Sequence, residues 1–331
     1  MARIGINGFG RIGRYLVRLM AERNEFPVVI NARADNASLA HLFKYDSVHH
    51  TFKGTVGHDE NGIIINGTHI AVTRCKPNEW QWKDYGVDLV VESTGTIKKR
   101  AGLAEHMACG AKKVIMSAPV SDADITIVMG VNDGLYDPAK HDVVSSASCT
   151  TNCLAPVAKV LNDTFGIEHG LMTTIHSYTM SQRILDGSHK DWRRGRAAAV
   201  SMVPSSTGAA KAVGQVLPEL AGKLNGMSVR VPTFDCSLVD LTCEVERPCD
   251  AAAVNAAFKA ASAGPLGAHF GYSDEPLVSI DYKGSTCGGV LDALSTQVLD
   301  QTMVKLLLWY DNEAGFTNQL LRLLRMVAKD C

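Results

Sequence analysis

One cysteine of this chain lies where a predicted strand gives way to a predicted helix. Cys149 stands inside the segment Ser-Ala-Ser-Cys-Thr-Thr-Asn-Cys, which covers residues 146–153. Val143 and Val144 before it are typical of a buried strand end, and the apolar residues after it recur at helical spacing. Unpaired amides and the positive dipole at a helix N-terminus favour a thiolate over a thiol. The position predicts a nucleophilic cysteine; a small apolar residue packed at a helix start is the alternative.

A second chemical motif lies close to the N-terminus. Residues 8–13 have the spacing Gly-x-Gly-x-x-Gly, between a predicted strand at 3–7 and a predicted helix that leads to another strand at 28–31. In this setting the glycines allow a tight turn, and the helix N–H groups can hold a pyrophosphate. The motif predicts a dinucleotide-binding turn; an ordinary glycine turn is the alternative.

Two kinds of strand and helix pattern position these motifs. The first half alternates strands and helices, which is typical of a parallel sheet covered on both faces. After residue 149, apolar and polar residues alternate, most clearly over 239–246, which indicates a sheet with one exposed face. Further strands are predicted at residues 87–91, 114–116, 125–129, 143–144 and 304–309, and a helix at 250–263.

We therefore predict two domains. Residues 1–148 and 312–331 would form an α/β Rossmann dinucleotide-binding domain. Residues 149–311 would form an α+β catalytic domain with a mainly antiparallel sheet.

Composition limits the partners and the cellular compartment that we expect for this protein. The 331 residues carry 33 basic and 34 acidic side chains, so nothing favours nucleic acid or an anionic membrane as the main partner. The nine cysteines include no CxxC pair, which predicts a reducing compartment and no bound metal. A strand begins within three residues of the N-terminus and no apolar run approaches eighteen residues, so we expect a cytoplasmic protein.

Four segments in the same order resemble phosphorylating glyceraldehyde-3-phosphate dehydrogenase. They cover residues 5–14, 148–153, 205–211 and 309–313, and the resemblance extends over nearly the whole chain. It implies oxidation of D-glyceraldehyde 3-phosphate to 1,3-bisphosphoglycerate, with NAD or NADP as hydride acceptor and inorganic phosphate as second substrate. It also implies a homotetramer.

The resemblance assigns a role to each matching residue. Cys149 would attack the aldehyde, and His176, directly after a predicted strand at 172–175, would hold the thiolate and take a proton. Thr179 and Arg230 would bind the substrate phosphoryl group. The incoming phosphate would be held by Ser148, Arg194, Thr207 and Gly208, with Thr150 counted among the phosphate-binding residues. The expected cofactor contacts are Gly8, Gly10, Arg11, Ile12, Asn31, Ala32, Arg33, Thr94, Gly95, Ser117, Ser188 and Asn312.

One departure from the family pattern concerns the cofactor. Members that use NAD usually carry Asp directly after the Asn at the end of the second strand, where this chain has Ala32. An acidic residue there binds the ribose 2′-hydroxyl and repels a 2′-phosphate. With Arg33 beside it and Ser188 in a later loop, the sequence favours NADP over NAD. The alternative is that Arg33 points to solvent and Asp35 contacts the ribose.

Two other functions are compatible with the same fold. Erythrose-4-phosphate dehydrogenase, a sister family, uses the same thiol and base, but residues 205–211 match a site for inorganic phosphate that a hydrolytic enzyme does not need. A non-catalytic nucleotide-binding or redox-sensing protein would not require both Cys149 and His176.

Overall fold

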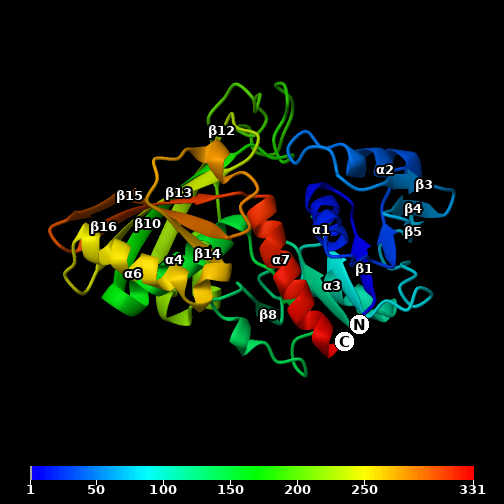
Figure 1. The fold of residues 1–331 in the computed structure, drawn as a ribbon, viewed down its shortest axis with the longest axis horizontal. Coiled ribbons are helices and arrows are strands. Elements are labelled where there is room, and N and C mark those ends of the chain that lie inside the picture. The colour runs from blue at the N-terminus through cyan, green and yellow to red at the C-terminus, as the bar shows by residue number, and fades with distance from the viewer. Residues whose placement is uncertain (1) are drawn as a thin grey trace. The chain divides into compact units, whose positions relative to one another are not determined.

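The computed structural model describes residues 2–331, which form two compact units (Figure 1). The first unit contains residues up to 127 together with 135–147 and 320–331, and the second contains 128–134 and 148–319. By this division, residues 128–134, residue 148 and residues 312–319 belong to the second unit, whereas the predicted boundaries place them in the first. The extents of the functional domains stay a prediction.

The first unit is built on a nine-stranded sheet with the order β3-β4-β5-β2-β1-β6-β7-β9-β8. Only the pairings of β4 with β3 and β5 are antiparallel, so the predicted parallel Rossmann sheet is confirmed. Its elements are β1 (Ile4–Asn7), α1 (Arg11–Ala21), β2 (Val29–Asn31), α2 (Asn36–Lys44), β3 (Val56–His58), β4 (Gly62–Ile65), β5 (Thr68–Thr73), β6 (Leu89–Glu92), α3 (Arg100–Ala108), β7 (Lys113–Met116), β8 (Ile125–Thr126) and β9 (Val143–Ser145).

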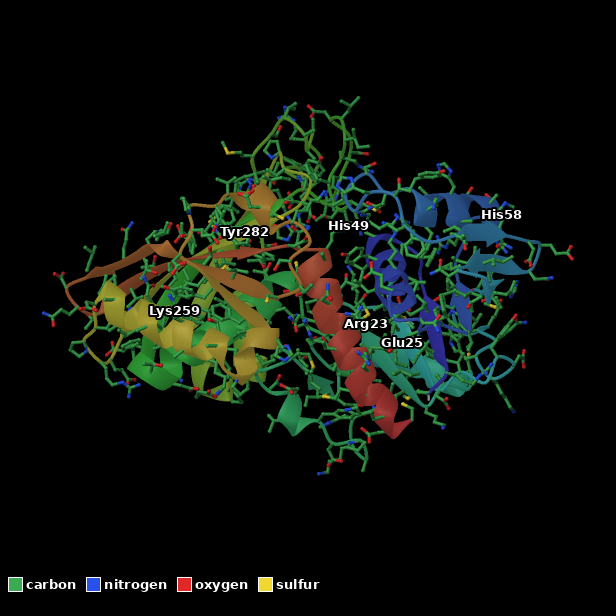
Figure 2. All side chains as sticks on the ribbon, viewed as in Figure 1. Arg23, Glu25, His49, His58, Lys259 and Tyr282 are labelled. Atoms are coloured by element: carbon green, nitrogen blue, oxygen red, sulfur yellow. The ribbon has the colours of Figure 1, made fainter. Side chains whose placement is uncertain are left out.

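The central strands of this sheet are apolar because helices cover a parallel sheet on both faces. Ile6, Leu89 and Val114 have no exposed surface. The last twelve residues also belong to this unit, where Arg325 lies 3.4 Å from Glu25. Glu25, which follows the turn after α1, is labelled in Figure 2.

Two details differ from the sequence prediction. Strands β3 to β5 were not predicted, because each contains only three to six residues and their pattern is weak. Strand β8 ends at Thr126, whereas the sequence predicts a strand to residue 129. The side chain of Asn132 accepts a hydrogen bond from the Val128 amide at 2.9 Å, and this bond turns the chain away from the sheet.

The second unit contains a seven-stranded sheet with the order β11-β12-β10-β13-β16-β15-β14. Four of the six pairings are antiparallel, as predicted; the pairs β10–β12 and β14–β15 are parallel. Its elements are α4 (Cys149–Phe165), β10 (Ile167–Ser177), β11 (Val203–Ser206), α5 (Ala209–Val216), β12 (Leu224–Val231), β13 (Ser237–Val245), α6 (Ala251–Ala263), β14 (Phe270–Ser273), β15 (Gly289–Leu299) and β16 (Met303–Tyr310), and α7 (Ala314–Val327) begins here.

Alternating burial along the strands gives the sheet of the second unit one buried face. Along β13, residues with buried and partly exposed side chains take turns from Ser237 to Val245. The buried face packs against helix α4, and the other face is wetter. Among the described residues, no helix is both long and apolar enough to cross a membrane.

Candidate active site

The turn between β1 and α1 requires glycine at two positions. Gly8 has φ of 97°, and a Cβ atom there would lie 2.8 Å from the backbone of Ser93 and Thr94. A Cβ atom on Gly13 would lie 2.3 Å from the carbonyl oxygen of Gly8. Any larger residue would therefore push α1 away from the ends of β1 and β6.

Helix α1 begins with amides that no side chain caps. Gly10 is its N-cap residue and makes no side-chain hydrogen bond, and the space where its Cβ would lie is open to 4 Å. Such a bare N-terminus suits a phosphate group. We expect Arg11 to contact such a group through its backbone amide, because its guanidinium forms an ion pair with Asp46 at 2.5 Å. Burial opposes ionisation of Asp46, but hydrogen bonds from Arg11 and nearby amides hold the pKa of this carboxyl well below its usual range.

A buried polar network fixes the loops around this turn. Glu92, at the end of β6, accepts hydrogen bonds from the Asn7 amide, from His106 at 3.1 Å and from the Thr94 backbone at 2.8 Å. These bonds outweigh burial and lower the pKa of Glu92, which therefore stays ionised. Asn31 is similarly engaged, donating to Asn7 at 2.8 Å.

The predicted cofactor residues of the first unit therefore come together. β2, β1, β6 and β7 are neighbours in the sheet, and their carboxyl ends carry the predicted loop residues. Thr94 and Gly95 are exposed, and the Ser117 hydroxyl donates to the Glu92 carbonyl at 3.0 Å. The structure places Gly8, Gly10, Arg11, Ile12, Asn31, Ala32, Arg33, Thr94, Gly95 and Ser117 at this edge.

The end of β2 carries more positive charge than the sequence analysis identified. Ala32 is buried and Arg33 is exposed. Asp35 caps α2 by accepting from the amide and hydroxyl of Ser38 at 2.8 and 2.7 Å, and these bonds lower its pKa. Arg74 donates to the carbonyl of Ala34 at 2.9 Å, so a second guanidinium lies beside this loop. Its position depends on the pairing of β2 with β5, which was not predicted.

In the second unit, the predicted nucleophile occupies the first position of α4. Ser148 is the N-cap, and its hydroxyl accepts a hydrogen bond from the Thr151 amide at 3.0 Å. Ala147 before it has φ of 58°, a left-handed conformation that turns the chain sharply into the helix. Cys149 is half-buried, with its Sγ atom 3.5 Å from Nε2 of His176. The prediction that a strand ends at residue 175 is wrong, because β10 continues through His176 to Ser177.

Strand pairing places Arg230 next to this histidine. β10 and β12 run parallel, and His176 is paired with Arg230 in the register. One terminal nitrogen of Arg230 lies 2.5 Å from Nδ1 of His176 and 3.1 Å from the Ser177 carbonyl oxygen. The same Nδ1 lies 2.7 Å from that carbonyl.

Nδ1 of His176 lies between a donor and an acceptor. The Arg230 guanidinium can only donate to it at 2.5 Å, whereas the Ser177 carbonyl oxygen can only accept from it at 2.7 Å, so the two contacts favour opposite tautomers of the neutral ring. Nε2 faces the Cys149 sulfur in both tautomers. If Arg230 moved onto an anion, Nδ1–H could donate to the Ser177 carbonyl, and Nε2 could act as a base.

The charges of the two reactive groups follow from burial. Burial, assisted by the charge of Arg230, lowers the pKa of His176 to about 3, so the ring is neutral near pH 7. Burial also raises the pKa of the Cys149 thiol, and Arg230 partly opposes this effect. The pKa direction differs from the prediction based on the helix N-terminus alone, because desolvation outweighs the dipole here.

Tyr310, which the sequence analysis did not single out, orders the interior of the site. Its hydroxyl lies 2.9 Å from the hydroxyl of Thr150 and 2.8 Å from that of Thr174. Its ring meets the ring of His176 edge to face, with centroids 5.9 Å apart. Thr150 is thus fixed by Tyr310 and is buried. Tyr310 lies within the 309–313 segment of the resemblance, which was the available signal.

Two arginines and the start of α5 carry the residues of the predicted anion sites. Burial, and to a smaller extent the charge of Arg194, lowers the pKa of Arg230. Nε of Arg230 is buried without a hydrogen-bond partner among the described residues, whereas Nε of Arg194 lies 3.4 Å from a carboxylate oxygen of Asp191. Gly208 is the N-cap of α5 and provides no side-chain cap, while Thr207 accepts from the Ala209 amide at 3.2 Å. Guanidinium groups and a helix start with a glycine N-cap suit phosphate groups.

Three further predicted residues belong to the second unit. Thr179 is partly exposed, with its hydroxyl 2.9 Å from that of Ser181. Asn312 is buried and accepts from the Ser237 hydroxyl at 2.7 Å. Ser188 lies in an exposed loop, where its carbonyl accepts from Arg183 at 2.9 Å.

Together, the Rossmann sheet and the paired cysteine and histidine define the class of dinucleotide-binding oxidoreductases with a thiol nucleophile. Residues 2–100 match the glyceraldehyde 3-phosphate dehydrogenase NAD binding domain, and residues 148–312 match the C-terminal domain of the same family. The chain belongs to the glyceraldehyde-3-phosphate dehydrogenase family.

Similar proteins from three bacteria carry the family name. The chain is 57% identical to glyceraldehyde-3-phosphate dehydrogenase 1 of Bacillus cereus over 98% of its own length and 97% of the relative. It is 55% identical to glyceraldehyde-3-phosphate dehydrogenase 1 of Bacillus subtilis, covering 99% and 98%. The corresponding protein of Geobacillus stearothermophilus is 54% identical, with 98% of each chain covered.

Proposed function

We propose that this protein catalyses the phosphorylating oxidation of D-glyceraldehyde 3-phosphate to 1,3-bisphosphoglycerate. The observation that carries the proposal is the contact between Cys149 Sγ and His176 Nε2 at 3.5 Å, with Arg230 on the opposite side of the imidazole. A nicotinamide dinucleotide, when bound, supplies the hydride acceptor.

The side chains perform the remaining steps. Nε2 of His176 takes the thiol proton of Cys149 as the sulfur attacks the aldehyde carbon, and it returns this proton to the carbonyl oxygen as the C=O π bond opens, which gives a thiohemiacetal. His176 takes the hydroxyl proton of this adduct as the carbon loses hydride, which leaves a thioester. Inorganic phosphate then attacks the thioester carbon, and the bond to Cys149 breaks to give the acyl phosphate and the free thiolate.

Binding of the substrate phosphate favours the basic form of His176. Before the aldehyde binds, Arg230 and the Ser177 carbonyl both lie within hydrogen-bond distance of Nδ1 of His176. When Arg230 binds the phosphoryl group, Nδ1–H can donate to the Ser177 carbonyl, and Nε2 is then free to take a proton. Thr179 would assist Arg230, and Ser148, Thr150, Arg194, Thr207 and Gly208 would serve the incoming phosphate.

Steady-state rates with two aldehydes test this function. We expect reduction of the cofactor with glyceraldehyde 3-phosphate to depend on inorganic phosphate and to exceed the rate with erythrose 4-phosphate. A higher efficiency with erythrose 4-phosphate, or no need for phosphate, would assign the sister activity instead. Binding of a dinucleotide without turnover of either aldehyde would indicate a non-catalytic protein.

We propose further that the enzyme prefers NADP over NAD. Ala32 supplies no carboxylate at the end of β2, Arg33 is exposed, and Arg74 lies beside the same loop. Asp35, the alternative ribose contact, is engaged in capping α2. Ser188 would add a donor from its exposed loop. Both cofactors should be compared with the native protein and with Ala32→Asp, which should shift the efficiency ratio toward NAD; an unchanged ratio would refute the role of Ala32.

Assembly as a cytoplasmic homotetramer is the last part of the proposal. The segment 180–202 exposes several large apolar side chains, more than an isolated chain normally leaves in water. They are Met180, Ile184, Leu185, Trp192, Val200 and Met202, each at least 74% exposed. Light scattering of the purified protein should give four times the chain mass of 35.6 kDa. A monomeric mass would contradict this proposal and leave the catalytic one untouched.

A further inference from the structure

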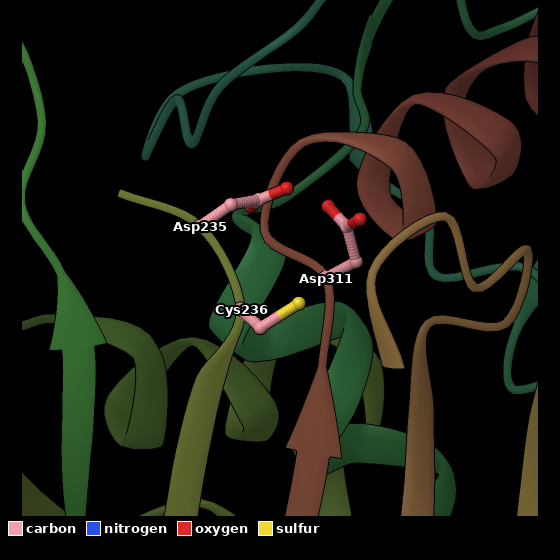
Figure 3. A group of neighbouring side chains, drawn as sticks. All are labelled: Asp235, Cys236 and Asp311. Atoms are coloured by element: carbon pink, nitrogen blue, oxygen red, sulfur yellow. The ribbon is translucent and has the colours of Figure 1, made fainter. Parts of the chain in front are cut away.

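Three buried side chains of the second unit converge where β13 begins and β16 ends. The carboxylates of Asp235 and Asp311 and the thiol of Cys236 each offer an atom, and these atoms lie within 4.8 Å of one another (Figure 3). Their residues are 5%, 0% and 3% exposed, respectively. The proposed reaction uses none of them.

The two carboxylates are not equivalent. Asp311 accepts hydrogen bonds from the amides of Gly284, Glu313 and Ala314 at 2.7, 2.9 and 2.6 Å. Both oxygens of Asp235 are buried without any hydrogen-bond partner among the described residues. A buried carboxylate without a donor, facing a second carboxylate, is strongly unfavourable unless a positive charge joins it.

The three side chains face one another within 4.8 Å, and no group of the described residues donates to either oxygen of Asp235. This arrangement favours a bound cation, and a proton is the competing occupant.

The ligand atoms identify the class of cation. A sulfur and two carboxylate oxygens suit a borderline-soft ion such as Zn²⁺, whereas Mg²⁺ and Ca²⁺ favour six or more oxygens. Zinc bonds of about 2.0–2.3 Å to tetrahedral ligands require these atoms to lie about 3.5 Å apart. Small side-chain rotations would bring them together.

We propose that Asp235, Cys236 and Asp311 form a binding site for a zinc-class divalent cation, with water as the fourth ligand. This departs from the expectation of no bound metal, which considered only cysteine spacing. The cation would join the start of β13 to the turn that begins α7. The adjacent residues Ser237 and Asn312 are themselves hydrogen-bonded at 2.7 Å, so the site lies next to a predicted cofactor contact.

Metal binding should be measured in a Cys149→Ser background, so that the reactive thiol does not compete. After stripping with chelator, equilibrium dialysis at pH 8 should show one equivalent of Zn²⁺ per chain, and Co²⁺ should give a sulfur-to-metal absorption band. Zn²⁺ should also raise the melting temperature.

Variants within and outside the cluster distinguish the site from other thiols and carboxylates. Asp235→Asn keeps the shape of the side chain and should weaken Zn²⁺ binding by at least about tenfold, while Cys236→Ala should remove the Co²⁺ band. Asp240→Asn and Cys243→Ala, on the same strand, should change neither. Circular dichroism checks that each variant is folded. Absence of the Zn²⁺ equivalent in the parent, or equal binding by Asp235→Asn, would overturn the proposal.

Discussion

The helices that begin at the candidate sites start in two different ways. α4 is capped by the Ser148 side chain, whereas α1 and α5 have Gly10 and Gly208 at the N-cap and no side-chain cap. A capped first turn is closed and rigid, which fixes the thiol of Cys149 at 3.5 Å from its base. A bare first turn leaves its N–H groups for an external anion. The difference separates a helix start that positions a nucleophile from helix starts that bind phosphate.

The largest expected effect on activity is that of replacing Cys149 at the capped start of α4. Cys149→Ser should retain the fold and lower the rate of aldehyde oxidation on the order of a thousandfold or more, because a hydroxyl is not ionised in this environment. Activity and circular dichroism should be measured together, with Cys243→Ala as the control thiol. Substantial activity in Cys149→Ser would place the nucleophile elsewhere.

Local patterns predicted that helices begin after the glycine turn and near Cys149, but they predicted neither α5 nor the chemical partners of these sites. The glycine turn, the strand before it and the apolar spacing after Cys149 involve neighbours in sequence, so periodicity and residue type were sufficient. The contact of His176 with Arg230 joins residues 54 positions apart and depends on the parallel register of β10 and β12. The raised pKa of Cys149 likewise depends on burial by distant segments, which the sequence pattern does not contain.

A second prediction separates the two anion sites. Arg194, whose guanidinium lies 3.4 Å from the Ser206 carbonyl just before α5, should serve inorganic phosphate, and Arg230 should serve the aldehyde phosphate. Arg194→Ala should raise the KM for inorganic phosphate, and Arg230→Ala the KM for the aldehyde. Each change should be about ten- to a hundredfold, as expected for loss of a charged donor to phosphate. Equal effects of both variants on both constants would show a single shared site.

A third prediction tests whether His176, which faces Cys149 at the start of α4, is neutral in the folded protein. Its pKa is about 3 in the folded protein against about 6.5 unfolded, so between these values the unfolded chain binds more protons. Stability should therefore fall as pH decreases below 6.5, by about 2 kcal/mol at pH 5 from this residue alone. Urea unfolding at pH 7.5 and pH 5 should show this loss in the native protein and a smaller one in His176→Asn. The same pH slope in both proteins would mean that His176 is charged in the fold.

The smallest effects compare the two kinds of helix start directly. Ser148→Ala removes the bond to the Thr151 amide and should lower the free energy of unfolding by about 1 kcal/mol. Gly10→Ser adds a side chain where the structure has open space, at φ of −77°, so stability should change by only a few tenths of a kcal/mol.

In dinucleotide binding the order of the two variants should be reversed: Gly10→Ser should have the larger effect and Ser148→Ala the smaller. The hydroxyl introduced by Gly10→Ser competes for the α1 amides that a pyrophosphate would use, so cofactor affinity should fall by several-fold, whereas Ser148→Ala should leave it nearly unchanged. Isothermal titration with each dinucleotide and urea unfolding of both variants measure the two quantities. If Gly10→Ser bound the cofactor as tightly as the native protein, the bare start of α1 would not be the pyrophosphate site. The contrast between capped and open helix starts would then describe folding alone, because the open amides would be satisfied by water rather than by a ligand.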